Sequence, residues 1–196
     1  MKKMNRREFL ALTGAAVVAL SLAGCDDAPP APPAPPAPPA PTTSKETDLL
    51  AAINKVWKEK FDAGKVKYEQ LTLNQDAVGL IRAYGRVFEE ANETPHKLTT
   101  GDREMLSKET IKFDEKMKKY GKKGFAGMVY ASDVDTEGTM TLEYKYSCED
   151  AAVRAFVDKL LNSNPDSSKA EFISIYLPVV QGKTYMTATI FLNDKA

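Results

Sequence analysis

The feature that most constrains this chain is a cluster of prolines near its N-terminus. Nine of the twelve prolines lie between Pro29 and Pro41, in an Ala-Pro-Pro repeat that begins at Ala28. Proline fixes φ and has no backbone N–H, so this tract favours polyproline II and cannot join a packed core. Fourteen residues at about 3.1 Å each reach about 43 Å, which predicts a semi-rigid spacer. A proline-rich ligand for a recognition module is the alternative.

The tract divides the chain into three expected parts. Residues 1–24 precede it as a signal peptide, residues 25–44 form the tether, and residues 45–196 follow as the folded part. The folded part has 152 residues, a normal size for one domain. A domain of this size buries roughly 68–70% of its extended-chain surface and needs no disulfide or metal to be stable.

The first part has the pattern of an export signal. Four basic residues between Lys2 and Arg7 precede an apolar run from Phe9 to Ala23. A charged segment followed by a short apolar one is typical of a secretory signal peptide. The run is also too short for a stable membrane span.

The apolar run ends at Leu22-Ala23-Gly24-Cys25, which resembles the lipobox of bacterial lipoproteins. The resemblance implies cleavage before Cys25 and attachment of diacylglycerol to its thiol. We therefore expect an exported protein held at a membrane through Cys25, with its domain facing the periplasm or the cell exterior. Asp26 resembles the residue that keeps some lipoproteins at the inner membrane, which slightly favours that membrane.

The segment Asn5-Arg6-Arg7-Glu8-Phe9-Leu10 resembles a twin-arginine export motif, and the residues that carry the resemblance are Arg6, Arg7, Phe9 and Leu10. The segment departs from the motif at Asn5, where Ser or Thr is usual, and at Ala11, where Lys is common. The resemblance implies export in the folded state. Such substrates often carry a cofactor inserted beforehand, but many carry none, so the cofactor stays unknown. A general secretory signal that contains two arginines is the alternative.

The charge balance argues against a nucleic-acid partner. After removal of residues 1–24 the chain has 23 basic and 26 acidic residues, a formal net charge of −3. Proteins that bind nucleic acids usually have a basic excess on one face, because neutralising phosphates drives their affinity.

The folded part begins with three segments of helical periodicity. Apolar residues recur at helical spacing from Thr43 or Ser44 to Gly64, from Asn74 to Phe88, and in a third helix that runs to about Tyr120. A short extended piece is expected at residues 66–73.

The second half has the composition of strands. Residues 125–134 and 139–147 predict a hairpin, and a helix follows from Ser147 to about Asn164. Two more strands are expected at residues 171–180 and 184–192, and one face of the last strand is more apolar than the other. The order predicts an α+β fold with an antiparallel sheet of about four strands, in ββαββ order, packed with the N-terminal helices.

His96 is the only histidine, and it lies in a loop beside Pro95 and Lys97. We interpret it as a solvated loop residue. The alternative is a hydrolase-like acid/histidine site in which His96 acts with Asp133 or Asp135. A single histidine cannot form the usual multi-histidine zinc site, so no metal is expected.

Asp133 and Asp135 also open a segment that is similar to a calcium-binding loop. That loop needs a bidentate glutamate at its twelfth position, which here is Tyr144. A charged hairpin turn is therefore the favoured interpretation.

Cys148 is the only thiol left once Cys25 is acylated. It is expected in the first turn of the fourth helix, where Ser147 and Asp150 have the pattern of a capping box. We interpret Cys148 as a partly buried structural residue. An unpaired thiol in an oxidising compartment also raises the alternative of intermolecular pairing.

The densest basic run is residues 116–123, which contains five lysines. A solvated helix C-terminus is the favoured interpretation, because cations suit that end of the helix dipole. Contact with anionic lipid near the anchor is the alternative.

The sequence lacks phosphate-binding glycine loops, nucleophile elbows, Cys-x-x-Cys pairs and haem attachment motifs. The leading hypothesis is a non-catalytic binding or accessory module that recognises an envelope protein or a small ligand. The alternatives are an envelope enzyme and a cofactor or ligand carrier exported in the folded state.

Overall fold

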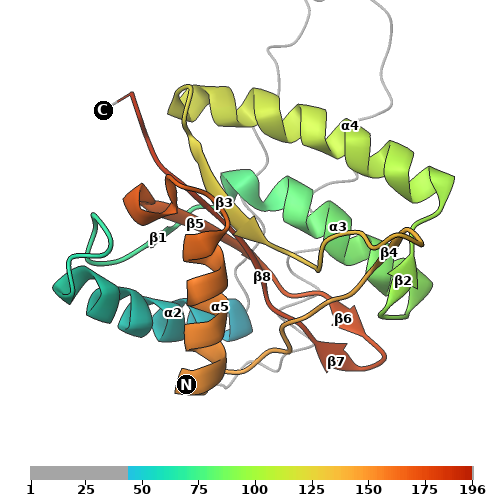
Figure 1. The fold of residues 1–196 in the computed structure, drawn as a ribbon, viewed down its shortest axis with the longest axis horizontal. Coiled ribbons are helices and arrows are strands. Elements are labelled where there is room, and N and C mark those ends of the chain that lie inside the picture. The colour runs from blue at the N-terminus through green and yellow to red at the C-terminus, as the bar shows by residue number, and fades with distance from the viewer. Residues whose placement is uncertain (1–43, 196) are drawn as a thin grey trace, which may run out of the picture. The chain divides into compact units, whose positions relative to one another are not determined.

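The computed structural model describes residues 44–195 (Figure 1). The export motif, Cys25 and the proline tract lie outside the described residues. The longer helices are α2 (Ser44–Asp62), α3 (Val78–Ala91), α4 (Thr100–Met117) and α5 (Asp150–Asn162). Three short 3-10 helices are η1 (Gln75–Ala77), η2 (Lys118–Tyr120) and η3 (Ser167–Lys169). The strands are β1 (Thr72–Leu73), β2 (His96–Lys97), β3 (Phe125–Val129), β4 (Thr139–Met140), β5 (Phe172–Tyr176), β6 (Val179–Val180), β7 (Lys183–Thr184) and β8 (Thr187–Phe191).

The main sheet has four strands in the order β1-β5-β8-β3. Strand β8 runs antiparallel to both β5 and β3, whereas β1 runs parallel to β5. This architecture confirms the predicted α+β class. The sheet is mixed rather than antiparallel, and the predicted ββαββ order is not confirmed, because β1 comes from the N-terminal half of the chain.

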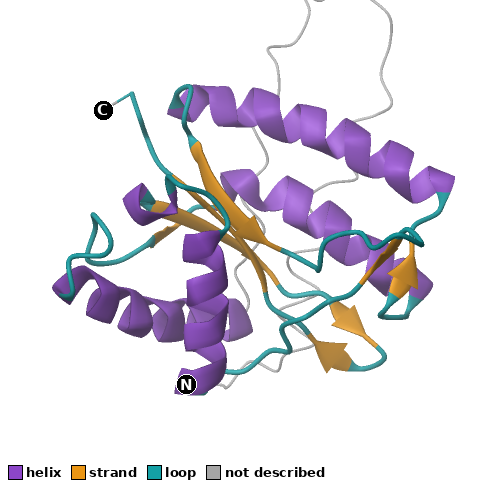
Figure 2. Ribbon diagram, viewed as in Figure 1, coloured by secondary structure: helices purple, strands orange, loops and turns teal. Residues whose placement is uncertain are grey.

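The predicted hairpin between residues 125–134 and 139–147 is wrong as a strand pair. Strand β3 pairs with β8, and β4 pairs with β2 in a separate small sheet (Figure 2). Only the turn resembles a hairpin, through backbone bonds from Ser132 to Thr141 and from Asp135 to Thr139. Burial explains the difference, since Ala126 and Val129 of β3 lie in the core beneath α5.

The C-terminal strands follow the prediction more closely. Strands β5 and β8 pair along their full length, and β6 pairs with β7 in a small hairpin between them. The turn places Gln181 at φ 50° and Gly182 at φ 72°. Two successive residues with positive φ suit the right-handed twist of a tight hairpin.

Helices cover both faces of the main sheet, with α2 and α5 on one face and α3 and α4 on the other (Figure 1). On the first face, Trp57 and Phe156 are fully buried in one cluster with Ile173 and Ile190. On the second face, Phe113 of α4 packs in a cluster with Phe191. All five residues of β8 are therefore buried, and the face that was expected to be less apolar is covered as well.

A third cluster lies between α3, the start of α4 and the small strand pairs. Phe88 and Leu106 meet Met140 and Val180 there. This cluster joins the small sheets to the helices and fixes the position of the 133–139 turn.

One helix cap lies where the sequence predicted it, and another does not. The Asn74 side chain accepts a hydrogen bond from the Asp76 backbone N–H at 3.0 Å and so caps η1, at the residue where the sequence predicted the helical segment to begin. Helix α3 follows η1 directly, and its own N-cap, Ala77, makes no side-chain capping bond. The predicted box of Ser147 and Asp150 does not form, because Glu149 is the N-cap of α5. Residues 66–73, expected to be extended, form a strand only at β1.

Gly127 allows α5 and η3 to pack directly on β3. A Cβ at Gly127 would lie 2.3 Å from Ser163 Oγ, 2.8 Å from Ser167 Oγ and 3.2 Å from the Leu160 carbonyl oxygen. The Ser167 hydroxyl is buried and donates to the Ala126 carbonyl at 2.6 Å. It cannot move aside without breaking that hydrogen bond.

Gly127→Ala is therefore expected to lower the free energy of unfolding by about 1–3 kcal/mol through overpacking. Gly79→Ala is the matched control, because a Cβ at Gly79 in α3 meets nothing within 4 Å. The control should raise stability by about 0.4–1 kcal/mol by restricting the unfolded chain. Urea unfolding of the two variants measures both values, and equal effects would contradict the packing described for β3 and α5.

Candidate functional site

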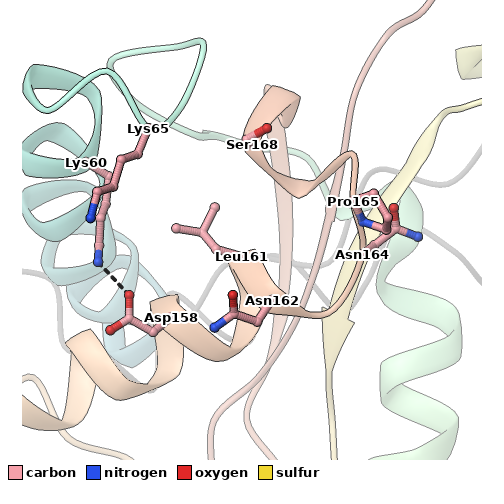
Figure 3. A pocket seen from close by; sticks show the side chains of 8 residues that line it. All are labelled: Lys60, Lys65, Asp158, Leu161, Asn162, Asn164, Pro165 and Ser168. Carbon is pink, nitrogen blue, oxygen red and sulfur yellow. Dashed lines mark hydrogen bonds and ion pairs between the residues drawn. The ribbon is translucent and has the colours of Figure 1, made fainter.

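One surface depression lies where the C-terminal ends of α2 and α5 meet (Figure 3). It has a volume of about 300 Å³. The residues that line it come from the end of α2 and the loop after it, from α5, and from the segment through η3: Lys60, Lys65, Asp158, Leu161, Asn162, Asn164, Pro165 and Ser168. Leu161 extends into the hollow, and the polar groups lie around it.

One ion pair dominates the electrostatics of this depression. Lys60 Nζ lies 2.5 Å from Asp158 Oδ1, and the Lys60 side chain is only 19% exposed. Lys60 also lies in the last turn of α2, where positive charge is favourable. A structural role in holding α2 against α5 therefore accounts for Lys60.

The remaining groups define what this depression can bind. Lys65, the amides of Asn162 and Asn164, and the hydroxyl of Ser168 are hydrogen-bond donors. They suit a small polar or anionic group. The lining contains neither histidine nor cysteine, so it offers no imidazole base to activate Ser168.

The second depression, of about 260 Å³, lies between α3, α4 and the 133–139 turn. Its floor is apolar, with Leu98, Leu106 and Met140, while Arg103 lies at its wall. Val134, which is 46% exposed, forms part of the rim. Chemically this hollow suits an apolar group that carries a negative charge.

Tyr84 connects this depression to a half-buried tyrosine pair. The rings of Tyr84 and Tyr130 stack with centroids 3.9 Å apart. Burial is the main cause of a strongly raised pKa at Tyr130, and the neighbouring Tyr84 adds to it. Tyr130 is therefore uncharged at physiological pH, and its ring packs against that of Tyr84.

The interpretation of His96 as a solvated loop residue is wrong. His96 begins β2, is 8% exposed and lies edge-on to Phe88. Its Nδ1 lies 2.7 Å from Glu93 Oε1 and its Nε2 lies 3.2 Å from Asp102 Oδ2. Both ring nitrogens are thus engaged within the fold.

The carboxylates beside His96 set its protonation. Burial lowers the pKa of His96, but the hydrogen bonds to Glu93 and Asp102 outweigh that effect and raise the pKa above its ordinary value. Asp102 is itself held by the Thr99 backbone N–H and hydroxyl in the capping box of α4. The imidazole therefore ties β2 to the start of α4.

Asp133 and Asp135 lie in the exposed turn before β4, as the hairpin-turn interpretation expected. Asp135 Oδ1 accepts hydrogen bonds from the backbone N–H groups of Glu137 and Thr139 at 2.9 and 2.8 Å. The carboxylate thus shapes the turn. The acid/histidine alternative is not supported by these contacts, because His96 bonds to Glu93 and Asp102 instead.

Cys148 is exposed, so the expectation of a partly buried residue is wrong. It lies before the first residue of α5 rather than in its first turn. The thiol lies 3.5 Å from the hydroxyl of Tyr146.

In residues 44–195 no group of three histidine, cysteine, aspartate or glutamate side chains lies close enough to share a metal ion.

Sequence reasoning missed both depressions. The first joins residues 60–65 to residues 158–168, and the second joins α3 and α4 to the 133–139 turn. Each depends on contacts between segments far apart in the chain, for which a single sequence carries no periodic signal. The only local signal was the polar segment from Asn162 to Asp166, which marked a helix end.

Neither a family model, a curated protein nor a solved structure matches this chain.

The contacts of His96 predict a pH-dependent contribution to stability. Because the pKa is raised in the folded state, the stabilisation is fully present below the unfolded value of about 6.5 and is lost as pH rises through the folded value. The free energy of unfolding lost in His96→Gln should therefore be larger at about pH 5.5 than at about pH 9. Urea unfolding of the wild type and of His96→Gln across this pH range measures the difference in the free energy of unfolding. A difference that does not change with pH would contradict an ionic interaction of protonated His96 with Glu93 and Asp102.

Proposed function

We propose that this chain is a membrane-anchored envelope lipoprotein whose domain is a non-catalytic binding or accessory module. Leu22-Ala23-Gly24-Cys25, placed after a basic and then an apolar segment, is the single observation that carries the proposal. The proposed product is cut before Cys25 and acylated there.

The position of the domain in the chain supports this proposal. Helix α2 begins at Ser44, three residues after the last proline of the tract. The proline tract therefore lies between the proposed lipid and the first helix, where a spacer would hold the domain off the membrane surface. None of the helices in residues 44–195 has the length and apolar character to span a bilayer.

The arrangement of side chains favours binding over catalysis as the proposed role. The His96 ring nitrogens bond to the carboxylates of Glu93 and Asp102, which hold the fold together. The Asp135 carboxylate accepts a hydrogen bond from the backbone of its own turn. The two depressions offer donors for a small polar group and a shallow apolar hollow with an arginine. These features suit recognition of a partner or a small ligand, and such binding is the activity that we propose for the domain.

The export route and the membrane are part of the same proposal. Arg6 and Arg7 followed by Phe9 and Leu10 support twin-arginine export of a folded domain, and Asp26 supports retention at the inner membrane. A cofactor or ligand carrier is compatible with that route.

Metabolic labelling with an alkyne analogue of palmitate in the native host tests the acylation. The wild-type chain should incorporate the label, and Cys25→Ala should lose it completely and keep residues 1–24, because cleavage requires the lipidated cysteine. Cys148→Ala is the matched control, since it removes the other cysteine, and it should label like the wild type. Label retained in Cys25→Ala, or lost in Cys148→Ala, would contradict acylation at Cys25.

A further inference from the structure

The C-terminal end of α4 concentrates positive charge on an otherwise balanced domain. Residues 116–123 contain five lysines and no acid, whereas residues 45–196 as a whole have a formal net charge of −1. We call this set the basic end: Lys116, Lys118, Lys119, Lys122 and Lys123. Positive charge is thus concentrated at the basic end, although the domain as a whole is almost neutral.

The fold turns these lysines outward. Met117, Tyr120 and Gly124 alternate with them and are buried, and the Tyr120 ring packs 4.8 Å from that of Phe191. All five lysines are exposed. Helix α4 ends at Met117 and the chain continues through η2 into a turn, so the favoured interpretation of this run as a helix end is confirmed.

Counter-charges neutralise only part of the basic end. Asp76 forms ion pairs with Lys119 and, at 3.7 Å, with Lys116, and it accepts a hydrogen bond from the Tyr120 hydroxyl. Burial opposes ionisation of Asp76, but these contacts outweigh it and lower the pKa of this carboxyl. One ionised carboxylate therefore serves two lysines.

The other three lysines have no ion pair within the described residues. The Asp194 carboxylate accepts a hydrogen bond from the backbone N–H of Lys123 and not from its ammonium group. Asp166 is paired with Lys169 at 2.7 Å, and it also lies within the electrostatic influence of Lys123. Lys118, Lys122 and Lys123 thus present ammonium groups to an external anion.

We propose that the basic end docks on the anionic phospholipid surface of the membrane to which the chain is anchored. The inference rests on the proposed lipid anchor, which keeps the domain near that surface. The reach of about 43 Å predicted for the proline tract exceeds the Debye length of about 8–10 Å, so the proposed attraction acts only when the domain approaches the membrane surface. The tether makes that approach intramolecular and so compensates for a modest affinity.

Vesicle binding of the unacylated chain tests the surface separately from the anchor. The protein is the processed chain from residue 25 with Cys25→Ser, mixed with phosphatidylcholine vesicles with or without about one third phosphatidylglycerol. The wild-type surface should bind only the anionic vesicles, and binding should fall steeply with added salt. Binding to both kinds of vesicle, or to neither, would overturn the proposal.

A pair of matched triple variants locates the contact. Lys118→Gln, Lys122→Gln and Lys123→Gln together should weaken partitioning about 100-fold, since each lysine near the surface contributes about fivefold. The control replaces three exposed lysines: Lys97→Gln in β2, Lys183→Gln in β7, and Lys145→Gln, which forms a bridge to Tyr185 just after β7. Strands β2 and β7 lie away from the end of α4 (Figure 1). It removes the same charge and should retain most of the binding.

The outcomes separate this proposal from its alternatives. Equal losses in the two triple variants would overturn the assignment to the basic end and leave only an effect of net charge. Binding to polyphosphate or single-stranded DNA without binding to anionic vesicles would overturn the lipid assignment. The urea midpoint of each variant should match the wild type, because the altered side chains are exposed, so a loss of vesicle binding reports the surface. Fatty-acid labelling at Cys25 is independent of either result.

Discussion

The structure depends on one strand, β8, which is buried on both faces and paired on both edges. It hydrogen-bonds to β5 and β3, and helices from opposite sides of the sheet cover its side chains. Burying Ile190 and Phe191 contributes about 1.5–3 kcal/mol for each side chain. Because β8 follows all the other strands of residues 44–195, neither helix layer has its complete sheet surface until β8 is in place.

The same constraint governs the polar residues of this strand. Thr187 donates to the Tyr176 carbonyl at 2.7 Å, whereas the Thr189 hydroxyl has no hydrogen-bond partner among the described residues. Leaving such a hydroxyl unpaired costs about 1–3 kcal/mol, so the surrounding apolar contacts must offset it. The alternation of threonine with apolar residues predicted that one face of the strand is less apolar than the other, and α3 and α4 cover that less apolar face.

The sequence predicted what depends on local pattern and missed what depends on distant contacts. The positions of α2, α3 and α5 follow from helical periodicity, and the β6–β7 turn follows from its glycine. The parallel pairing of Thr72 with Phe172 joins residues that are far apart in sequence and leaves no local mark. The prediction for His96 was wrong for the same kind of reason. Its burial depends on contacts with Phe88 and Asp102, and the residues next to His96 in the sequence do not reveal these contacts.

The two proposals rest on features of different origin. A sequence motif supports acylation at Cys25, and the structure supplies a domain whose basic end faces outward. The most direct measurement is the intact mass of the protein extracted from its own membrane, under denaturing and then native conditions. We predict a denatured mass equal to residues 25–196 plus the acyl groups on Cys25, and a larger native mass if a partner or ligand is held. An unmodified full-length chain of 21.5 kDa would contradict it.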